Sequence, residues 1–174
     1  MPWPTFNTEQ YTPEFLKELA PLIYLHYKEI SADLDIPLQP VWDDYAKAAA
    51  AGVLRIFTIR CDGKLIGYSV FSVRPATHYE TSIQANNDII WLHEDFRKQL
   101  LGYRFIQWCD RQLRITDKVQ KVRHHVKLAH NWGKLLERQG YGAEEIIYSK
   151  RLDLDQELNP REVGKDEYPE GGGA

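Results

Sequence analysis

Residues 88–108 combine an apolar segment, a basic cluster and a glycine in an order that suits anion binding. Residues 89–92 are a short run of β-forming side chains, and from residue 101 apolar residues recur at helical spacing. Arg97, Lys98 and Arg104 flank the expected start of this helix. The first N–H groups of a helix lack partners within it, and the helix dipole favours an anion there. The pattern indicates a phosphate site, and it is equally typical of an ordinary strand–helix corner with surface charges.

Histidines are the second group of residues that could do chemistry, since imidazole titrates near neutral pH. His124 and His125 are adjacent in an expected strand, so at most one of them faces a given cleft. A hydrogen-bonded position in the core is the alternative for each. We predict no metal site, because the histidine spacing matches no zinc pattern and Cys61 and Cys109 are the only cysteines.

The composition is that of a folded protein from a reducing compartment. The chain has 174 residues with 43% hydrophobic content, enough for one domain with a core. Its net charge of −3 points to neither a nucleic-acid nor a membrane partner. No apolar run approaches the roughly 20 residues of a membrane-spanning helix, and the first residues lack the features of a signal peptide. We therefore predict a cytoplasmic location.

Local patterns predict strands and helices in the order β, α, α, β, β, β, α, β, α, β. The expected segments are residues 5–11, 13–30, 41–51, 53–59, 65–73, 89–92, 101–115, 119–127, 131–140 and 144–152. Pro21 is expected to kink or split the first helix. Asp62-Gly63 is a hairpin signal, and residues 75–82 are expected to be a loop.

This order predicts an α/β (α+β) fold with one mixed, mostly antiparallel sheet and helices on both faces. The predicted domain covers residues 1–152. Residues 153–174 are charged, contain proline and glycine, and are expected to form a flexible C-terminal tail.

Three segments, in this order and spacing, resemble the GCN5-related N-acetyltransferase (GNAT) superfamily. Residues 90–97, IWLHEDFR, resemble the end of a strand in that family, and residues 97–102, RKQLLG, resemble its acetyl-CoA loop. Residues 130–141, HNWGKLLERQGY, are similar to its later helix and turn, and residues 146–152 to its last strand. The resemblance covers roughly residues 53–152, and the segment around His124 and His125 is also similar to acetyltransferases of tailed phages.

The resemblance implies acetyl-CoA as cofactor and direct attack of a substrate amine on its thioester. The pantetheine arm would pair with the strand, a backbone N–H near Leu92 would meet the thioester oxygen, and the pyrophosphate would lie at the helix start. The cofactor-binding residues that it implies are Trp91, Leu92, His93, Arg97, Lys98, Gln99, Leu100, Leu101, Gly102, Tyr103, Arg104 and Asn131.

Two positions depart from the family's pattern. Leu100 replaces the first glycine of the loop, a position that can have an ordinary helical φ, so the leucine narrows the approach to the pyrophosphate without excluding binding. Leu136 replaces the tyrosine that protonates the departing thiolate in many members, and losing a general acid costs on the order of 10²–10⁴ in rate. A slow enzyme, a different acid and an inactive protein with the same fold all stay open.

The resemblance also requires a base for the attacking amine. Asp88 is the first candidate, since it precedes the thioester site on the same strand; its alternative is a solvated strand end. Glu29 on the first helix is the second, and His124 and His125 are the third. Residues expected to line the substrate groove are Tyr24, His26, Tyr27 and Trp42.

The predicted function is therefore acetyl-CoA-dependent N-acetyltransfer to an amine-bearing small molecule or protein. The alternative is a catalytically weak or inactive GNAT-fold protein with a binding or structural role, for example in a phage, which would place it in the host cytoplasm.

Overall fold

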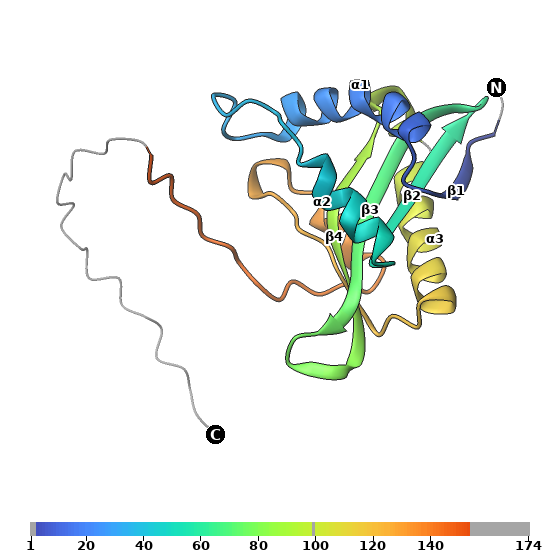
Figure 1. Cartoon of the computed structure of the whole chain (residues 1–174), viewed down its shortest axis with the longest axis vertical. Helices are drawn as coiled ribbons and strands as arrows, with labels where there is room; N and C mark the ends of the chain where they lie inside the picture. The colour runs from blue at the N-terminus through green and yellow to red at the C-terminus, as the bar shows by residue number, and fades with distance from the viewer. Residues whose placement is uncertain (1–2, 99, 154–174) are drawn as a thin grey trace. The chain divides into compact units, whose positions relative to one another are not determined.

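The computed structural model describes residues 3–98 and 100–153 (Figure 1). The chain divides into two units, Met1–Gly142 and Ala143–Ala174. The elements of the first unit are β1 (Thr5–Glu9), α1 (Pro13–Ile30), α2 (Trp42–Ala50), β2 (Leu54–Cys61), β3 (Lys64–Ala76), β4 (Tyr79–Leu92), the 3₁₀ turn η1 (Glu94–Phe96), α3 (Leu101–Thr116), β5 (Lys121–Arg123), the 3₁₀ turn η2 (Leu128–His130) and α4 (Gly133–Glu137).

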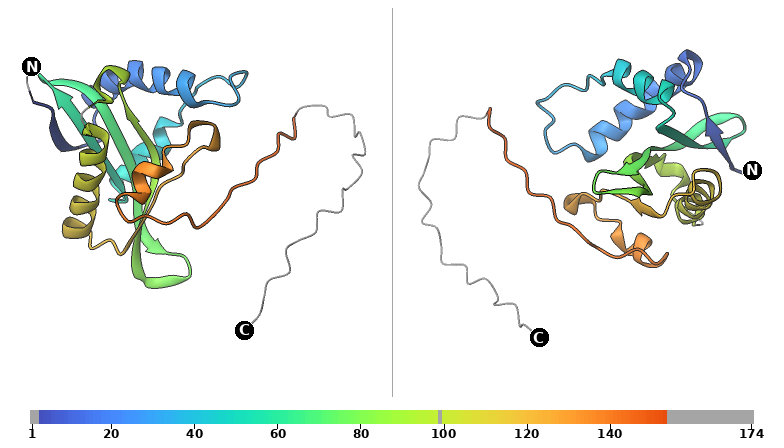
Figure 2. Two further views of the ribbon diagram at one scale, coloured as in Figure 1. Left: turned by 180° about the vertical axis from the view of Figure 1, so that it is seen from behind. Right: turned by 60° about the horizontal axis from the view of Figure 1, so that its bottom comes forward.

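The strands form one sheet in the order β1-β2-β3-β4-β5. Neighbouring strands are antiparallel except β4 and β5, which run parallel. Helices α1 and α2 lie on one face and α3 on the other, as the right-hand view of Figure 2 shows. Phe15 and Leu19 of α1 pack on the first face, and Phe105 and Leu113 of α3 pack on the second. The predicted fold class, a mixed and mostly antiparallel sheet between helices, is confirmed.

Turn chemistry explains the first hairpin. Asp62 and Gly63 have φ values of 52° and 76°, which are the positive angles of the tight turn that the dipeptide predicts. The next hairpin is longer than expected, because Pro75 pairs with Ile83 and Ala76 with Tyr79, so both strands extend into the segment predicted to be a loop. Residues 79–81 are exposed, so their sequence lacks the apolar alternation that identifies a half-buried strand.

Helix α1 is not split at Pro21, which was one of the two effects expected of this proline. It runs without a break through Pro21, which is exposed, while Phe15, Leu19 and His26 are buried on its inner side. Burial of that side against the sheet stabilises the helix despite the hydrogen bond that a proline removes.

The elements after α3 are shorter than predicted. β5 has three residues and α4 has five. The predicted last strand is wrong, since residues 143–151 have no regular secondary structure. A strand needs a partner for its backbone hydrogen bonds, and an apolar run alone does not supply one. Residues 154–174, for which a flexible tail is predicted, lie outside the described residues. Every helix in the described part is too short or too polar to cross a membrane.

Candidate functional site

Strands β4 and β5 separate after a short contact, and this separation opens one edge of β4. β5 pairs with β4 only at Gln84, Ala85 and Asn86. On its other side β4 stays paired with β3 as far as Leu92. Within the described residues, the last part of β4 therefore has no strand neighbour on the β5 side. We call this opening the β4–β5 split.

The backbone of β4 presents hydrogen-bonding groups to the split. The N–H of His93 donates to the carbonyl of Ile66 at 2.8 Å, so His93 points its backbone groups at β3. Orientation alternates along an antiparallel pair, and Leu92 and Ile90 therefore point theirs away from β3. The Leu92 carbonyl indeed accepts from Arg97 Nε at 2.8 Å on that side. The N–H of Leu92 is then a donor directed into the split.

A β-bulge lies where the split begins. The register shifts between Val70 and Phe71 leave Asp88 without a partner residue on β3. Asn87 is buried and donates Nδ2 to Ser69 Oγ at 2.9 Å and to the carbonyls of Val70 and Ile89, both at 3.1 Å. These bonds hold the bulge in one conformation.

Asp88, the first candidate base, is exposed at this bulge. Its Oδ2 accepts from the hydroxyl of Tyr45 on α2 at 2.7 Å. Burial, and secondarily the Asp88 carboxylate, raises the pKa of Tyr45, so the phenol stays protonated and donates. Asp88 thus has an accessible carboxylate with one oxygen fixed in place, which is compatible with proton transfer from a substrate.

The start of α3 follows directly after β4 and η1. The N–H of Arg104 donates to the carbonyl of Leu100, whereas helix geometry leaves the N–H groups of Gly102 and Tyr103 without partners inside the helix. Lys98 and Arg104 are exposed beside them. The helix start therefore has the donors and the positive charge that a phosphate group requires. Gln99, predicted to be part of this site, lies outside the described residues.

Leu100 has a backbone conformation that the sequence did not lead us to expect. Its φ is 60°, in the left-handed region, and its side chain is 67% exposed. Leu100 therefore does not adopt the ordinary helical φ that its residue type allows. Glycine adopts this conformation without steric cost, and leucine does not.

Arg97 and Glu29 are brought together by the structure. Arg97 Nη1 and Nη2 each lie 2.6 Å from a Glu29 oxygen, and the indole Nε1 of Trp91 donates to Glu29 Oε2 at 2.8 Å. The hydrogen bonds from Arg97 lower the pKa of Glu29. Glu29 is thus a carboxylate with three donors, which makes it a weak base, and the Arg97 side chain is directed at α1.

His26 is a buried polar residue behind this pair. Its Nδ1 lies 2.9 Å from the hydroxyl of Tyr68, and its ring stacks on Trp91 at a centroid distance of 6.3 Å. Burial lowers the pKa of His26 to about 4, so the ring is neutral at pH 7. The sequence suggested only that His26 lines the groove; its position four residues after Leu22, on the apolar side of α1, is the signal for burial.

The two adjacent histidines follow β5, which ends at Arg123, so the prediction that they lie within a strand is wrong. Their surroundings nevertheless differ. His125 is exposed, whereas His124 packs edge-on against Phe71, Trp132 and Tyr141 at 5.4–5.6 Å. Burial lowers the pKa of His124 to about 4. Neither ring nitrogen has a hydrogen-bond partner in the described residues, so His124 is not the hydrogen-bonded core residue that we weighed as its alternative.

Asn131 precedes the short helix α4, whose N-terminal cap is Trp132, and it makes no hydrogen bond to β4 within the described chain. Its Oδ1 accepts from the N–H of Gly133 at 2.8 Å, two residues further on, so the predicted role of Asn131 as the N-cap of this helix is wrong. Among the described residues, no three histidine, cysteine, aspartate or glutamate side chains converge on a possible metal position.

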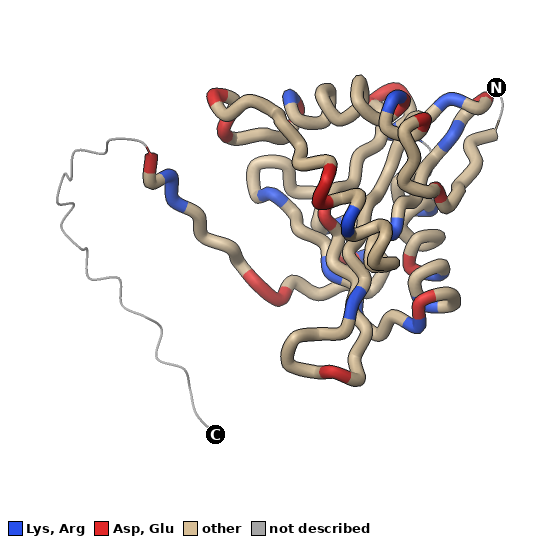
Figure 3. The backbone as a smooth tube through the Cα atoms, in the orientation of Figure 1, with Lys and Arg blue, Asp and Glu red and all other residues tan. Residues whose placement is uncertain are grey.

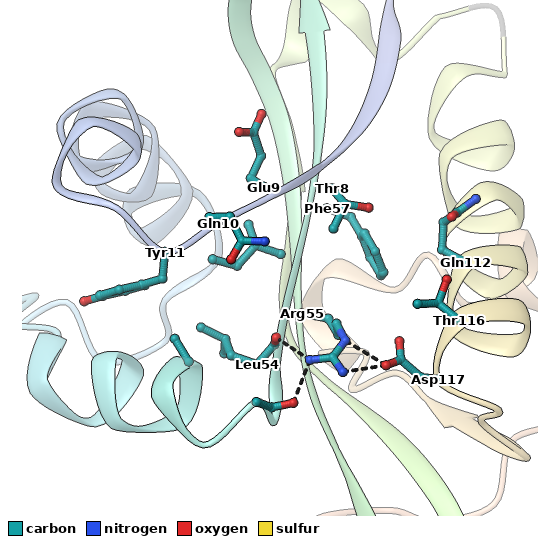
Figure 4. Close-up of a pocket in the computed structure, with 13 residues that line it drawn as sticks. Thr8, Glu9, Gln10, Tyr11, Leu54, Arg55, Phe57, Gln112, Thr116 and Asp117 are labelled. Carbon is teal, nitrogen blue, oxygen red and sulfur yellow. Dashed lines mark hydrogen bonds and ion pairs between the residues drawn. The ribbon is translucent and has the colours of Figure 1, made fainter.

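A separate cavity of about 320 Å³ lies by β1 and β2, at the other edge of the sheet (Figure 4). None of the predicted site residues lines it. Its charged groups are paired, Arg55 Nε with Asp117 at 2.8 Å and Glu9 with Arg60 at 2.7 Å. We assign no function to this cavity.

No protein-family model and no curated protein matches the chain, but solved structures do. A ribosomal-protein-alanine N-acetyltransferase from Brucella melitensis biovar Abortus 2308 is 18% identical, with a TM-score of 0.63 over 86% of this chain and 99% of that one. AAC(6')-Iy in complex with a CoA bisubstrate analogue is 15% identical, with a TM-score of 0.60 over 84% and 98%. A transcriptional regulator from Bacillus halodurans C-125 is 12% identical, with a TM-score of 0.66 over 84% and 99%. These similarities identify the fold as that of the GNAT acetyltransferases.

Proposed function

We propose that this protein is an acetyl-CoA-dependent N-acetyltransferase. The observation that supports it best is the β4–β5 split, which ends at the start of α3. An open strand edge suits an extended chain of amide groups, and a helix start suits the phosphates at the end of that chain. In the proposed complex the pantetheine arm lies along the open edge of β4, and the pyrophosphate lies at Gly102, Tyr103 and the neighbouring basic residues.

The proposed chemistry is acetyl transfer from sulfur to nitrogen. The substrate amine attacks the thioester carbon, the C–S bond breaks, and CoA leaves as a thiolate. The N–H of Leu92 donates to the carbonyl oxygen, where negative charge develops. Asp88 accepts the proton that the amine loses through intervening water, because four strand residues, roughly 13 Å, separate it from Leu92.

No side chain at position 136 can protonate the thiolate, because Leu136 is apolar and buried. Free thiols have pKa values of about 8–9, so a thiolate leaves at neutral pH without an acid, at reduced rate. This supports a slow enzyme. It also favours the second candidate, a protein that binds acyl-CoA and transfers nothing.

The acceptor that we propose is a cationic amine. The connection from α1 to α2 and the first turn of α2 carry aspartates, visible as red segments in Figure 3: Asp33, Asp35, Asp43 and Asp44. A local excess of carboxylates raises the concentration of a positively charged substrate near the site. We keep the cytoplasmic location and the link to tailed phages as predictions from the sequence.

Calorimetry with acetyl-CoA, followed by a thiol assay for released CoA with a panel of amines, tests both candidates. Binding with release supports the enzyme, and binding without release supports the second candidate. Absence of binding at millimolar acetyl-CoA contradicts both. Asp88→Asn is expected to leave the Kd unchanged and to lower kcat by about 10²–10⁴, whereas Glu14→Gln, an exposed control at the start of α1, leaves kcat unchanged. Unchanged turnover in Asp88→Asn would remove Asp88 as the base.

A further inference from the structure

We infer that Glu29 is a positioning residue that joins α1 to the end of β4 and holds Arg97 on the Leu92 carbonyl. This inference rests on the proposed function and deepens it. In this inference Arg97 has a structural role at the end of β4, where acyl transfer would occur. The sequence motif alone suggests that Arg97 binds phosphate.

On the β4 side, Glu29, Arg97, Trp91 and the Leu92 carbonyl are joined by hydrogen bonds. The Glu29 carboxylate receives both terminal nitrogens of Arg97 and the indole nitrogen of Trp91, all within 2.8 Å. Arg97 Nε donates to the Leu92 carbonyl at 2.8 Å. Bidentate pairs of this kind fix orientation as well as distance. The guanidinium is therefore directed along β4 and toward α1.

The same helix end is also attached on the other side of the split. Lys127, which follows β5 in the chain, donates Nζ to the carbonyl of Ile30 at 3.0 Å. Ile30 is the last residue of α1, and a cation at a helix C-terminus is favourable. The final turn of α1 thus connects the two strands that the split separates, through Glu29 to β4 and through Ile30 to the segment after β5.

This arrangement determines which groups of β4 can meet a ligand. Because Arg97 Nε already donates to the Leu92 carbonyl, that carbonyl is a weaker acceptor for a pantetheine amide, while the N–H of Leu92 still faces the split. The open edge consequently ends in a donor, which is the group that a thioester oxygen needs. Glu29 keeps the Arg97 guanidinium in place, and so keeps Arg97 Nε bonded to the Leu92 carbonyl.

The competing explanation makes the opposite prediction. If Arg97 binds the pyrophosphate directly, Glu29 competes with the cofactor for it, and removing the Glu29 charge tightens binding. If Glu29 positions Arg97, removing that charge weakens binding. The sign of one change in Kd therefore separates the two.

The test is a double-mutant cycle on the Kd for acetyl-CoA, measured by calorimetry with the wild type, Glu29→Gln, Arg97→Gln and the double variant. Both side chains are partly exposed, so we expect Glu29→Gln to weaken binding by about 5- to 10-fold. The Kd of the double variant is expected to equal that of Arg97→Gln alone, because either substitution already removes the contact between Glu29 and Arg97. Glu14→Gln, at the exposed start of the same helix, is the control and leaves the Kd unchanged.

The calorimetric stoichiometry separates positioning from loss of fold, since an unfolded fraction lowers the number of sites and leaves the Kd of the folded remainder unchanged. An unchanged or smaller Kd in Glu29→Gln, or additive effects in the double variant, would overturn this inference alone. A wild type that does not bind acetyl-CoA would overturn the proposed function, and this inference with it.

Discussion

Leu100 is the residue at which the chain departs most from the pattern of an acetyl-CoA loop. Its positive φ places a β-carbon close to the following carbonyl, which costs roughly 1–2 kcal/mol for a residue other than glycine. The side chain is exposed, so it does not recover that cost by packing. The loop therefore keeps the backbone shape that glycine would give while its surface is narrowed by a leucine.

Leu100→Gly is expected to raise the free energy of unfolding by about 0.5–1 kcal/mol, because relief of the strained φ exceeds the extra backbone entropy of glycine in the unfolded chain. It should also tighten acetyl-CoA binding by opening the approach to the start of α3. Urea unfolding and calorimetry measure the two effects. Leu128→Gly is the matched control, since Leu128 is exposed and has no positive φ, and it should destabilise the protein.

His26 and His124 predict a dependence of stability on pH. Burial lowers the pKa of each to about 4, below the roughly 6.5 of an unfolded histidine. Between these values the unfolded chain binds more protons, so stability falls as the pH is lowered from about 7 toward 4. Each histidine should cost about 2 kcal/mol at pH 5 relative to pH 7. Urea unfolding at both pH values measures the loss.

Variants at positions 124 and 125 assign this loss. His124→Phe keeps an aromatic ring against its aromatic neighbours and should remove about half of the difference between pH 7 and pH 5. His125→Gln, at the exposed neighbouring position, should leave it as in the wild type. If the wild type and His124→Phe lost the same free energy of unfolding between pH 7 and pH 5, folding would not lower the pKa of His124.

At the scale of elements, the end of β4 organises the candidate site. The bulge at Asp88, the open edge at Leu92 and the start of α3 follow one another along a single strand–turn–helix segment. Asn87 holds the bulge by bonding to β3 and to its own strand. The position of the candidate base thus depends on a neighbouring amide that takes no part in the chemistry.

Asn87→Ala is expected to lower the free energy of unfolding by about 2–4 kcal/mol, because it removes three hydrogen bonds in a buried position. It should also lower kcat, since the conformation that presents Asp88 is no longer fixed. Asn86→Ala, in the regular part of the β4–β5 pairing, is the control. A variant with normal kcat would show that the bulge does not need Asn87 to place Asp88.

At the scale of the whole molecule, the site lies within the unit Met1–Gly142, which holds every helix and strand of the described chain. The sequence predicts that the residues after 152 form a flexible tail outside the domain, and we expect such a tail to add nothing to cofactor binding. A chain that ends at Asp153 is therefore expected to keep the melting temperature and the Kd for acetyl-CoA of the full chain. A weaker Kd after this truncation would assign part of the site to residues 154–174.

The sequence by itself determined the elements whose signals are local. The Thr12-Pro13 start of α1, the Asp62-Gly63 turn and the helical spacing after Leu101 each depend on neighbours within a few residues. The GNAT fold class followed from the order of these elements and from the resemblance of three short segments. The prediction of a strand at residues 144–152 was wrong, because a strand must pair with a partner strand and no local pattern specifies that partner.

Only the tertiary structure decided which candidate residues meet. Glu29 and Arg97 are far apart in the chain, and their pairing depends on how α1 crosses the sheet. The positive φ of Leu100 is a property of the folded chain that a leucine in the sequence argues against. Local propensity is set by the chemistry of adjacent residues, whereas a site is set by the packing of elements. The sequence therefore indicated a position for acetyl-CoA. The structure showed that Glu29, a candidate base, and Arg97, a candidate cofactor ligand, form an ion pair with each other.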